Sequence, residues 1–267
     1  MLLLVCQGLF AQGRVTTRKY RFSDFGDKVT KIVLTGDPAL DATLGEDIVR
    51  SWNASAFEFC SMADFNAVKT QENYYWLLRT EAEGVEFLTL MKGGPAAAEG
   101  IDKSLEVISL PLRGAGNEGG RELLYLDALI CGIQSFAKAA ALSERTAYSP
   151  NDFFNENFTR YGRMKRIYLL EEDIAPQVKQ ADRSRYLDED IIVCDEDRAD
   201  TAFMEGEYNA LVSYVVCPAQ AGNGAYCYKL FIEAGTNTIY YIRRHKLGRR
   251  TGPGFLTEDF KRIARLR

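Results

Sequence analysis

The chain has 267 residues, a length that suits one large domain or two small ones. Hydrophobic residues make up 46% and charged residues 26%, as in ordinary globular proteins, and the formal net charge is −4. This acidic balance argues against nucleic-acid binding as the main role. After the first eleven residues we find no apolar run long enough to span a bilayer.

Residues 1–11 form an apolar stretch that is similar to the end of a secretory signal peptide, with cleavage expected after Ala11. Two features oppose this interpretation: the basic segment before the run is missing, and Leu9 is large for its place near the cleavage point. The alternative is an apolar first strand. We favour export and expect a periplasmic or secreted protein, with 1–11 as a signal-peptide remnant and 12–30 as a lead-in.

Residues 31–141 are expected to form a first α/β unit. Apolar spacing predicts a helix over 42–52, and Ser61 with Asp64 has the pattern of a capping box that opens a second helix. A Gly-rich turn and a last helix complete the unit. Apolar runs bounded by turn residues predict strands at 31–35, 56–60, 74–79, 85–91 and 105–110.

Residues 166–267 repeat this order of elements after a linker over 142–165. A short helix is predicted around 175–180, and another follows the glycine-containing loop 248–254. Fourteen residues separate Cys60 from Tyr74, and fourteen separate Cys194 from Tyr208. Apolar runs predict strands at 166–170, 190–194, 208–214, 229–232 and 238–242.

The fold class is therefore predicted as α/β with α+β character, in two tandem similar units. Each unit has the order βαβαβββα around a mixed sheet. The alternative is one continuous mixed sheet with helices on both faces. Phe153, Phe154 and Phe158 of the linker are expected to pack between the units.

The order βαβαβββα resembles the small α/β lobes of bacterial envelope proteins, such as the amino-terminal domain of the Tol-system propeller protein and the curli-secretion lipoprotein. This resemblance implies an envelope assembly or interaction module. It concerns element order alone, so it assigns no functional residue.

Cys217 and Cys227 flank a loop between two predicted strands. We predict that they form a disulfide, which would stabilise such a short hairpin by about 2–3 kcal/mol. The sequence contains neither a CxxC pair nor a cysteine–histidine cluster, so we expect no metal site and no cofactor.

Two charged segments are the candidate ligand-binding residues. A basic tail is predicted to bind an anionic partner, and two carboxylates follow a predicted strand, where ligands of open α/β sheets commonly bind. The alternatives are solvated surfaces and an acidic helix N-terminus. The basic residues are Arg243, Arg244, His245, Lys246, Arg249 and Arg250, and the carboxylates are Asp195 and Asp197.

Gly114, Gly116 and Gly119 form a GxGxxG pattern between a strand and a helix, as a dinucleotide fingerprint requires. However, the pattern follows the fifth predicted strand of the unit rather than the first. A structural turn therefore explains these glycines better than nucleotide binding does.

We expect an exported binding or scaffold protein that acts through an interlobe cleft or a protein-interaction surface, such as an exposed edge strand, on an envelope protein or a glycan. The alternative is a carboxylate-dependent hydrolase that acts on a glycan or peptide through Asp195 and Asp197. A nucleotide-binding enzyme is a third hypothesis. Because the sequence has no catalytic motif, binding is favoured over catalysis.

Overall fold

The computed structural model describes residues 22–117, 119–220 and 224–266. The predicted signal-peptide remnant, 1–11, and the start of the lead-in lie outside these residues. The described end of the lead-in belongs to the first unit, because Phe22 and Phe25 are buried in its core.

The two units contain the same eight elements in the same order. In the first unit these are β1 (Val29–Val33), α1 (Pro38–Ser51), β2 (Phe57–Cys60), α2 (Met62–Val68), β3 (Tyr74–Ala82), β4 (Val85–Lys92), β5 (Leu105–Gly114) and α3 (Arg121–Leu142). In the second unit they are β6 (Arg166–Leu170), α6 (Gln180–Tyr186), β7 (Ile191–Cys194), α7 (Glu196–Met204), β8 (Ala210–Val216), β9 (Tyr226–Glu233), β10 (Ile239–Lys246) and α8 (Thr257–Leu266). Between them lie α4 (Glu144–Ala147) and α5 (Pro150–Tyr161).

Each unit has its own five-stranded mixed sheet. The strand order is β2-β1-β3-β4-β5 in the first sheet and β7-β6-β8-β9-β10 in the second, so the two orders correspond strand by strand. In each sheet the first three strands are parallel and the last three are antiparallel. The predicted fold class is confirmed, and the alternative of one continuous sheet is wrong.

The strand order places the first two helices of a unit on opposite faces of its sheet. The connection from β1 to β2 runs in one direction along the sheet, and the connection from β2 to β3 runs back in the other direction, past β1. Because both crossovers are right-handed, helices that connect strands in opposite directions lie on opposite faces. The core agrees with this rule. Ile32 packs in the cluster that contains Leu44 of α1, whereas its neighbour Val33 packs in the cluster that contains Phe65 of α2.

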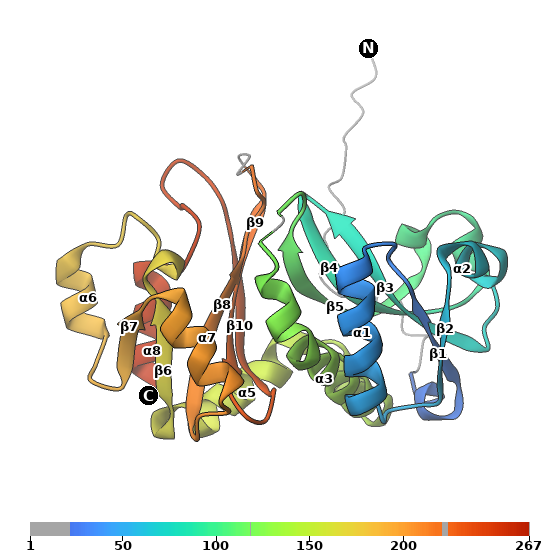
Figure 1. Cartoon of the computed structure of the whole chain (residues 1–267), viewed down its shortest axis with the longest axis horizontal. Coiled ribbons are helices and arrows are strands. Elements are labelled where there is room, and N and C mark those ends of the chain that lie inside the picture. Colours follow the sequence, from blue (N-terminus) through green and yellow to red (C-terminus); the bar gives the residue numbers. More distant parts are fainter. Residues whose placement is uncertain (1–21, 118, 221–223, 267) are drawn as a thin grey trace, which may run out of the picture.

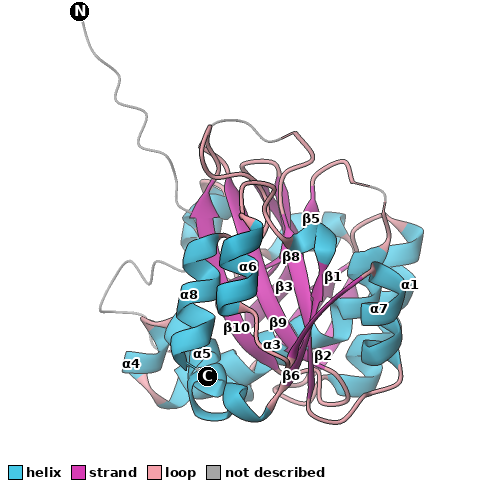
Figure 2. Cartoon of the chain, turned by 90° about the vertical axis from the view of Figure 1, so that its left-hand side faces the viewer, coloured by secondary structure: helices cyan, strands magenta, loops and turns pink. Residues whose placement is uncertain are grey.

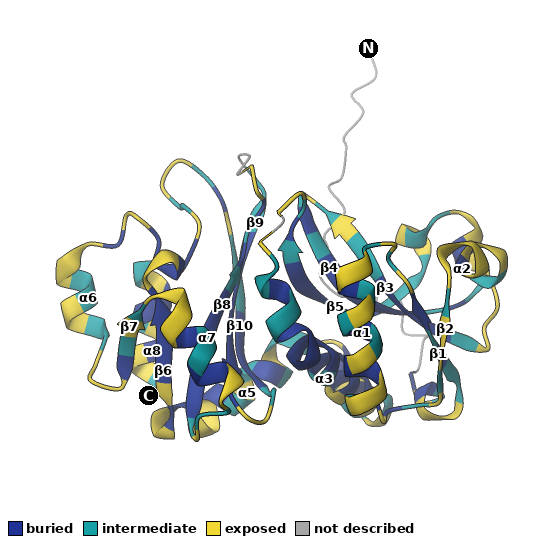
Figure 3. Cartoon of the chain, in the orientation of Figure 1, coloured by how far each residue is buried: buried dark blue, intermediate teal, exposed yellow. Residues whose placement is uncertain are grey.

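The long helix α3 lies between the two sheets, where 13 of its 22 residues are buried (Figures 1 and 3). Leu129 and Ile133 belong to one hydrophobic cluster with Leu110 of the first sheet and Ile232 of the second. On the far side of the second sheet, α6 and α8 lie side by side (Figure 2). The units therefore share their largest hydrophobic cluster, and each unit has a smaller cluster of its own beside it.

By length and composition alone, α3 is also apolar enough to cross a membrane, which the sequence analysis overlooked. In this fold, 67% of its most apolar window is buried inside the protein. Because both sheets pack on α3, the apolar character has a structural explanation as that of a central core helix.

Polar contacts also join the two units. The Tyr214 hydroxyl of β8 donates a hydrogen bond to the carbonyl oxygen of Leu112 in β5. Arg121 of α3 lies 2.8 Å from the Asp200 carboxylate of α7, which also accepts a hydrogen bond of 2.7 Å from Tyr125. The interface is thus filled by side chains from both units.

The linker predicted over 142–165 is largely helical. Packing between the units is confirmed for Phe153 and Phe154, which contact Phe136 of α3 in the cluster that both units share. It is wrong for Phe158, which packs in a cluster of the second unit alone. Phe154 of α5 stacks on Phe136 of α3, while Phe158 stacks on Phe231 of β9, with ring centroids 6.2 and 5.8 Å apart. The Asn155 side chain exchanges two hydrogen bonds with the backbone of Ile242 and so covers the edge of β10.

The helix predicted around 175–180 is wrong. The chain there pairs with the loop before α8, since the Ala175 N–H donates to the Phe255 carbonyl oxygen, and α6 begins only at Gln180. By contrast, the capping box of Ser61 and Asp64 is present at the start of α2.

Candidate functional site

A pocket of about 430 Å³ opens in the first unit at the carboxyl end of β1. In the sheet, β1 has β2 on one side and β3 on the other, so the chain connections diverge at its carboxyl end. Ligands of open α/β sheets bind at such switch points. The β1–α1 turn, β4, the end of β5 and the first turn of α3 line it. The lining residues are Asp37, Ala39, Leu40, Glu86, Arg113, Gly116, Asn117, Gly120, Glu122 and Leu123.

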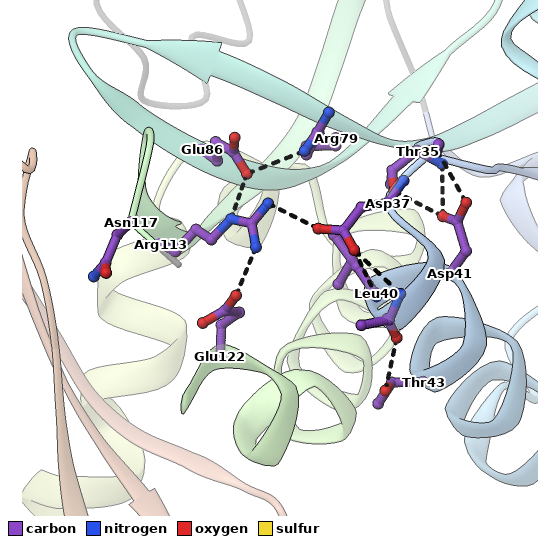
Figure 4. Close-up of polar contacts among 12 residues, drawn as sticks. Thr35, Asp37, Leu40, Asp41, Thr43, Arg79, Glu86, Arg113, Asn117 and Glu122 are labelled. Carbon is purple, nitrogen blue, oxygen red and sulfur yellow. Dashed lines mark hydrogen bonds and ion pairs between the residues drawn. The ribbon is translucent and has the colours of Figure 1, made fainter. Parts of the chain in front are cut away.

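Three carboxylates converge on the guanidinium group of Arg113 (Figure 4). Its Nε atom lies 2.8 Å from Glu86, one Nη atom lies 2.7 Å from Glu122, and the other lies 3.2 Å from Asp37. The three carboxylates come from β4, α3 and the β1–α1 turn respectively. The network therefore holds together the elements that surround the pocket.

The β1–α1 turn has its own hydrogen bonds, which fix Asp37 in place. Asp37 is the N-cap of α1, and its Oδ1 atom accepts hydrogen bonds from the backbone N–H groups of Ala39 and Leu40. The carboxylate of Asp41 accepts hydrogen bonds from the backbone and hydroxyl groups of Thr35 (Figure 4). Asp37 thus points at Arg113 from a preorganised helix start.

The electrostatics keep this site charged. The Leu40 N–H and then Arg113 lower the pKa of Asp37, so its carboxylate is ionised at neutral pH. Burial opposes the charge on Arg113, but its hydrogen bonds to Glu122, Glu86 and Asp37 outweigh that effect and raise its pKa. With Arg79 beside Glu86, three carboxylates face two guanidinium groups, which leaves one negative charge.

The second unit has an ion network at the corresponding places, but it is closed. Lys229 of β9 and Arg243 of β10 both pair with Asp259 in the first turn of α8. In the first unit, Arg113 of β5 pairs both with Glu86 of β4 and with Glu122 in the first turn of α3. Lys229 and Asp259 are only 1% and 2% exposed. The network is thus a feature of the repeated unit, and its version in the first unit borders a pocket.

The glycines of the GxGxxG pattern have structural explanations. A Cβ atom on Gly114 would lie 2.3 Å from the carbonyl oxygen of Cys217 in the second unit, and Gly116 has a φ of +75°. The loop borders the pocket, but a pyrophosphate there would meet the carboxylates of Asp37, Glu86 and Glu122. The geometry favours the structural-turn explanation.

The predicted ligand-binding residues do not form one site. Asp195 is the N-cap of α7 and accepts a hydrogen bond from the Arg198 N–H, and Asp197 is exposed on the first turn of that helix. Both follow β7, at one edge of the second sheet, whereas the basic residues belong to β10 and its loop, at the other edge. Ligand binding by either set stays a prediction.

The basic residues of this set lie in different environments. Arg243 pairs with Asp259, while Arg244 lies 4.2 Å above the ring of Tyr226. His245 is half-buried rather than a surface residue, and burial lowers its pKa. Its Nε2 atom lies 2.9 Å from the carbonyl oxygen of Gly252. Lys246, Arg249 and Arg250 are exposed.

Sequence reasoning missed the residues around Arg113, although one signal was present. Asp37 before Pro38 has the pattern of a helix N-cap followed by an N1 proline, which would have placed that carboxylate at the end of β1. Nothing in the sequence indicated that Glu86 and Glu122 would meet Arg113.

A second missed residue is Asp173, a buried carboxyl group just after β6. Its Oδ2 atom accepts a hydrogen bond from the Ser213 hydroxyl, and Ser213 accepts one from the Leu170 N–H. Burial raises the pKa of Asp173 to about 6. The folded protein therefore binds this proton more tightly than the unfolded chain, so the contribution to stability is full below pH ~4 and is lost as the pH rises through about 6.

We predict that Asp173→Asn raises the free energy of unfolding at pH 7 by about 2 kcal/mol, since the amide cannot ionise but still accepts from Ser213. Urea unfolding of both proteins from pH 4 to 7 measures this. The difference between them should shrink toward zero at pH 4. A difference that does not change with pH would contradict the prediction.

No protein-family model, curated protein or solved structure matches the chain. The assignment of a role therefore depends on the geometry of the molecule itself.

Proposed function

We propose that this is an exported, periplasmic or secreted, binding or scaffold protein that takes up a cationic group of its partner in the pocket around Arg113. The supporting observation is the net negative pocket at the switch point of the first sheet. The apolar segment before residue 12 supports export. A lysine or arginine side chain of an envelope protein, or the amine of an amino sugar, has the required chemistry.

The net charge of the pocket distinguishes between cationic and anionic ligands. The carboxylates of Glu86 and Glu122 already accept hydrogen bonds from Arg113, and carboxylate oxygens can accept further bonds from an ammonium or guanidinium donor. An anionic glycan or a phosphate would meet the excess negative charge. Binding is thus favoured for cations over anions.

The shared hydrophobic cluster supports rigid binding rather than closure of two lobes. Ion pairs and hydrogen bonds between Arg121, Tyr125 and Asp200, together with Phe153 and Phe154 of α5, hold the units together. A partner would accordingly dock on a preformed surface. This differs from the interlobe cleft that the sequence analysis considered, because the pocket lies within the first unit.

The test is calorimetric titration at low salt with a lysine- and arginine-containing peptide, a chitosan oligomer, and the acetylated form of each. We expect the amines to bind and the acetylated forms to bind at least ~10-fold more weakly, since one lost charge pair at a half-buried site is worth on the order of 1.4 kcal/mol. Glu122→Gln should weaken binding by a similar factor.

Two variants make this test specific. Asn117→Ala changes the pocket wall without touching the ion network and should also weaken binding. Glu205→Gln removes the same charge from an exposed position of the second unit and should leave binding unchanged. Equal affinity for the amines and their acetylated forms would overturn the proposal, and so would equal effects of Glu122→Gln and Glu205→Gln.

A further inference from the structure

Cys217 and Cys227 face each other across two neighbouring antiparallel strands. The last registered pair of β8 and β9 is Val216 with Tyr228, so the next position places Cys217 opposite Cys227. The Ala234 N–H bonds the Ala210 carbonyl oxygen, which makes that pair a hydrogen-bonded one. By alternation along the ladder, the cysteines occupy a non-hydrogen-bonded pair, where Cα atoms are about 4.5 Å apart, within reach of a disulfide.

The two sulfur atoms differ in environment. Both cysteines are free, and Cys227 is fully buried while Cys217 is half-buried. Their thiols are hydrogen-bonded to each other, and the Gly254 N–H donates to the Cys227 sulfur at 3.2 Å. The hydrogen bond from Cys217 lowers the pKa of Cys227 and raises that of Cys217.

The charged groups around the pair act on the pKa of Cys227 in both directions. Lys229, two residues along β9 on the same face, also lowers the pKa of Cys227, while burial and Asp173 oppose it. His245 lies opposite Cys227 on β10 and contacts the Gly252 carbonyl oxygen. The described residues hold no cluster of three metal-ligating side chains, so the two sulfurs are not part of a larger metal site there.

We propose that Cys217 and Cys227 form a thiol–disulfide exchange site whose co-reactant is a low-molecular-weight disulfide. The half-buried Cys217 gives its proton to solvent, and its thiolate attacks one sulfur of the disulfide while Cys227 remains a thiol. One half of the co-reactant leaves as a thiolate, and a mixed disulfide remains on Cys217.

The second step completes the exchange. The released thiolate takes the proton from Cys227, whose thiolate then attacks the Cys217 sulfur and expels the second half as a thiolate. The two cysteine sulfurs are oxidised to one protein disulfide, and the co-reactant is reduced to one thiol and one thiolate.

The exchange has a structural consequence at the unit interface. The carbonyl oxygen of Cys217 lies where a side chain on Gly114 would project, so this segment packs directly on the first unit. A disulfide would fix the segment to β9 through the Cys227 sulfur, which accepts from the Gly254 N–H. We expect the oxidised protein to melt at a higher temperature than the reduced one.

The experiment treats the reduced protein with oxidised glutathione, blocks remaining thiols with N-ethylmaleimide, and identifies the products by intact mass and peptide mapping. The wild type should lose two hydrogen atoms and yield a peptide in which Cys217 and Cys227 are linked. Cys227→Ser should accumulate one glutathione on Cys217. Cys217→Ser should leave Cys227 unmodified, because that sulfur is buried.

Cys60→Ser and Cys194→Ser are the matched controls, since they remove other half-buried thiols and should leave the linked peptide unchanged. Circular dichroism confirms that each variant is folded. The proposal fails if the wild type forms no linked peptide at any ratio of oxidised to reduced glutathione. It also fails if glutathione accumulates in Cys217→Ser rather than in Cys227→Ser.

Discussion

Asp259→Ala is expected to lower the free energy of unfolding by about 3–5 kcal/mol, because it leaves the ammonium group of Lys229 buried without its carboxylate. Lys229 lies at 1% exposure in β9, and the Asp259 carboxylate is its hydrogen-bonded partner. The same carboxylate accepts from the Leu256 N–H and pairs with Arg243. One substitution thus breaks the network that attaches α8 to the second sheet.

Urea unfolding measures this loss, and its pH dependence identifies the cause. Burial lowers the pKa of Lys229 in the folded protein, despite the opposing effect of Asp259. A lysine whose folded pKa lies below its unfolded value contributes stability that is full above the unfolded pKa and is lost as the pH falls. Without Asp259 the folded pKa drops further, so the variant should gain stability between pH 7 and 10 more steeply than the wild type.

Two further variants act as controls. Glu258→Ala removes a carboxylate from the adjacent, exposed position of the same helix and should cost less than ~1 kcal/mol. Adding Lys229→Met to Asp259→Ala should recover much of the loss, because no buried charge then remains. Equal costs for Asp259→Ala and Glu258→Ala would show that the pair contributes little.

Gly114→Ala is expected to destabilise the protein by about 3 kcal/mol, since the added methyl group would overlap backbone atoms of the other unit. Its Cβ atom would lie 2.3 Å from the Cys217 carbonyl oxygen and 3.1 Å from the Ala219 nitrogen. Because these are backbone atoms, they cannot move aside without shifting β8 or its following loop.

The matched control is Gly45→Ala in α1, where a Cβ atom would meet nothing within 4 Å. There the methyl group should raise stability by about 0.5–1 kcal/mol, because alanine favours a helix interior and glycine does not. Thermal unfolding of both variants compares the same chemical change at two sites. If Gly114→Ala leaves the melting temperature unchanged, the interface does not require a glycine there.

The ion networks of the two units lie at corresponding places in the fold. The β4–β5 hairpin meets α3 through Arg113, and the β9–β10 hairpin meets α8 through Lys229 and Arg243. The charge differs only on the middle strand of each hairpin sheet, where β4 has Glu86 and β9 has Lys229, while the arginine and the helix carboxylate are present in both units. The ion network that is buried in the second unit corresponds to the network that borders the pocket in the first unit. We therefore place the candidate site in the first unit.

Local sequence patterns were sufficient to predict the features whose hydrogen-bond partners lie close together in the sequence. The capping box of Ser61 and Asp64 and the turn at Gly84 could be predicted because turn and cap chemistry involves residues close in sequence. The helix predicted around 175–180 failed for the converse reason. The Ala175 N–H at its start donates to the carbonyl oxygen of Phe255, about eighty residues away, and no local pattern contains that partner.

By itself, the sequence determined the order of elements, the two similar units and the packing role of Phe153 and Phe154, because apolar periodicity and turn residues act over short distances. Only the tertiary structure decided that the units share their largest hydrophobic cluster around α3, and that Asp37, Glu86 and Glu122 surround Arg113. Those contacts join residues as many as 76 positions apart. Their geometry depends on how strands and helices pack, which residue order alone does not specify.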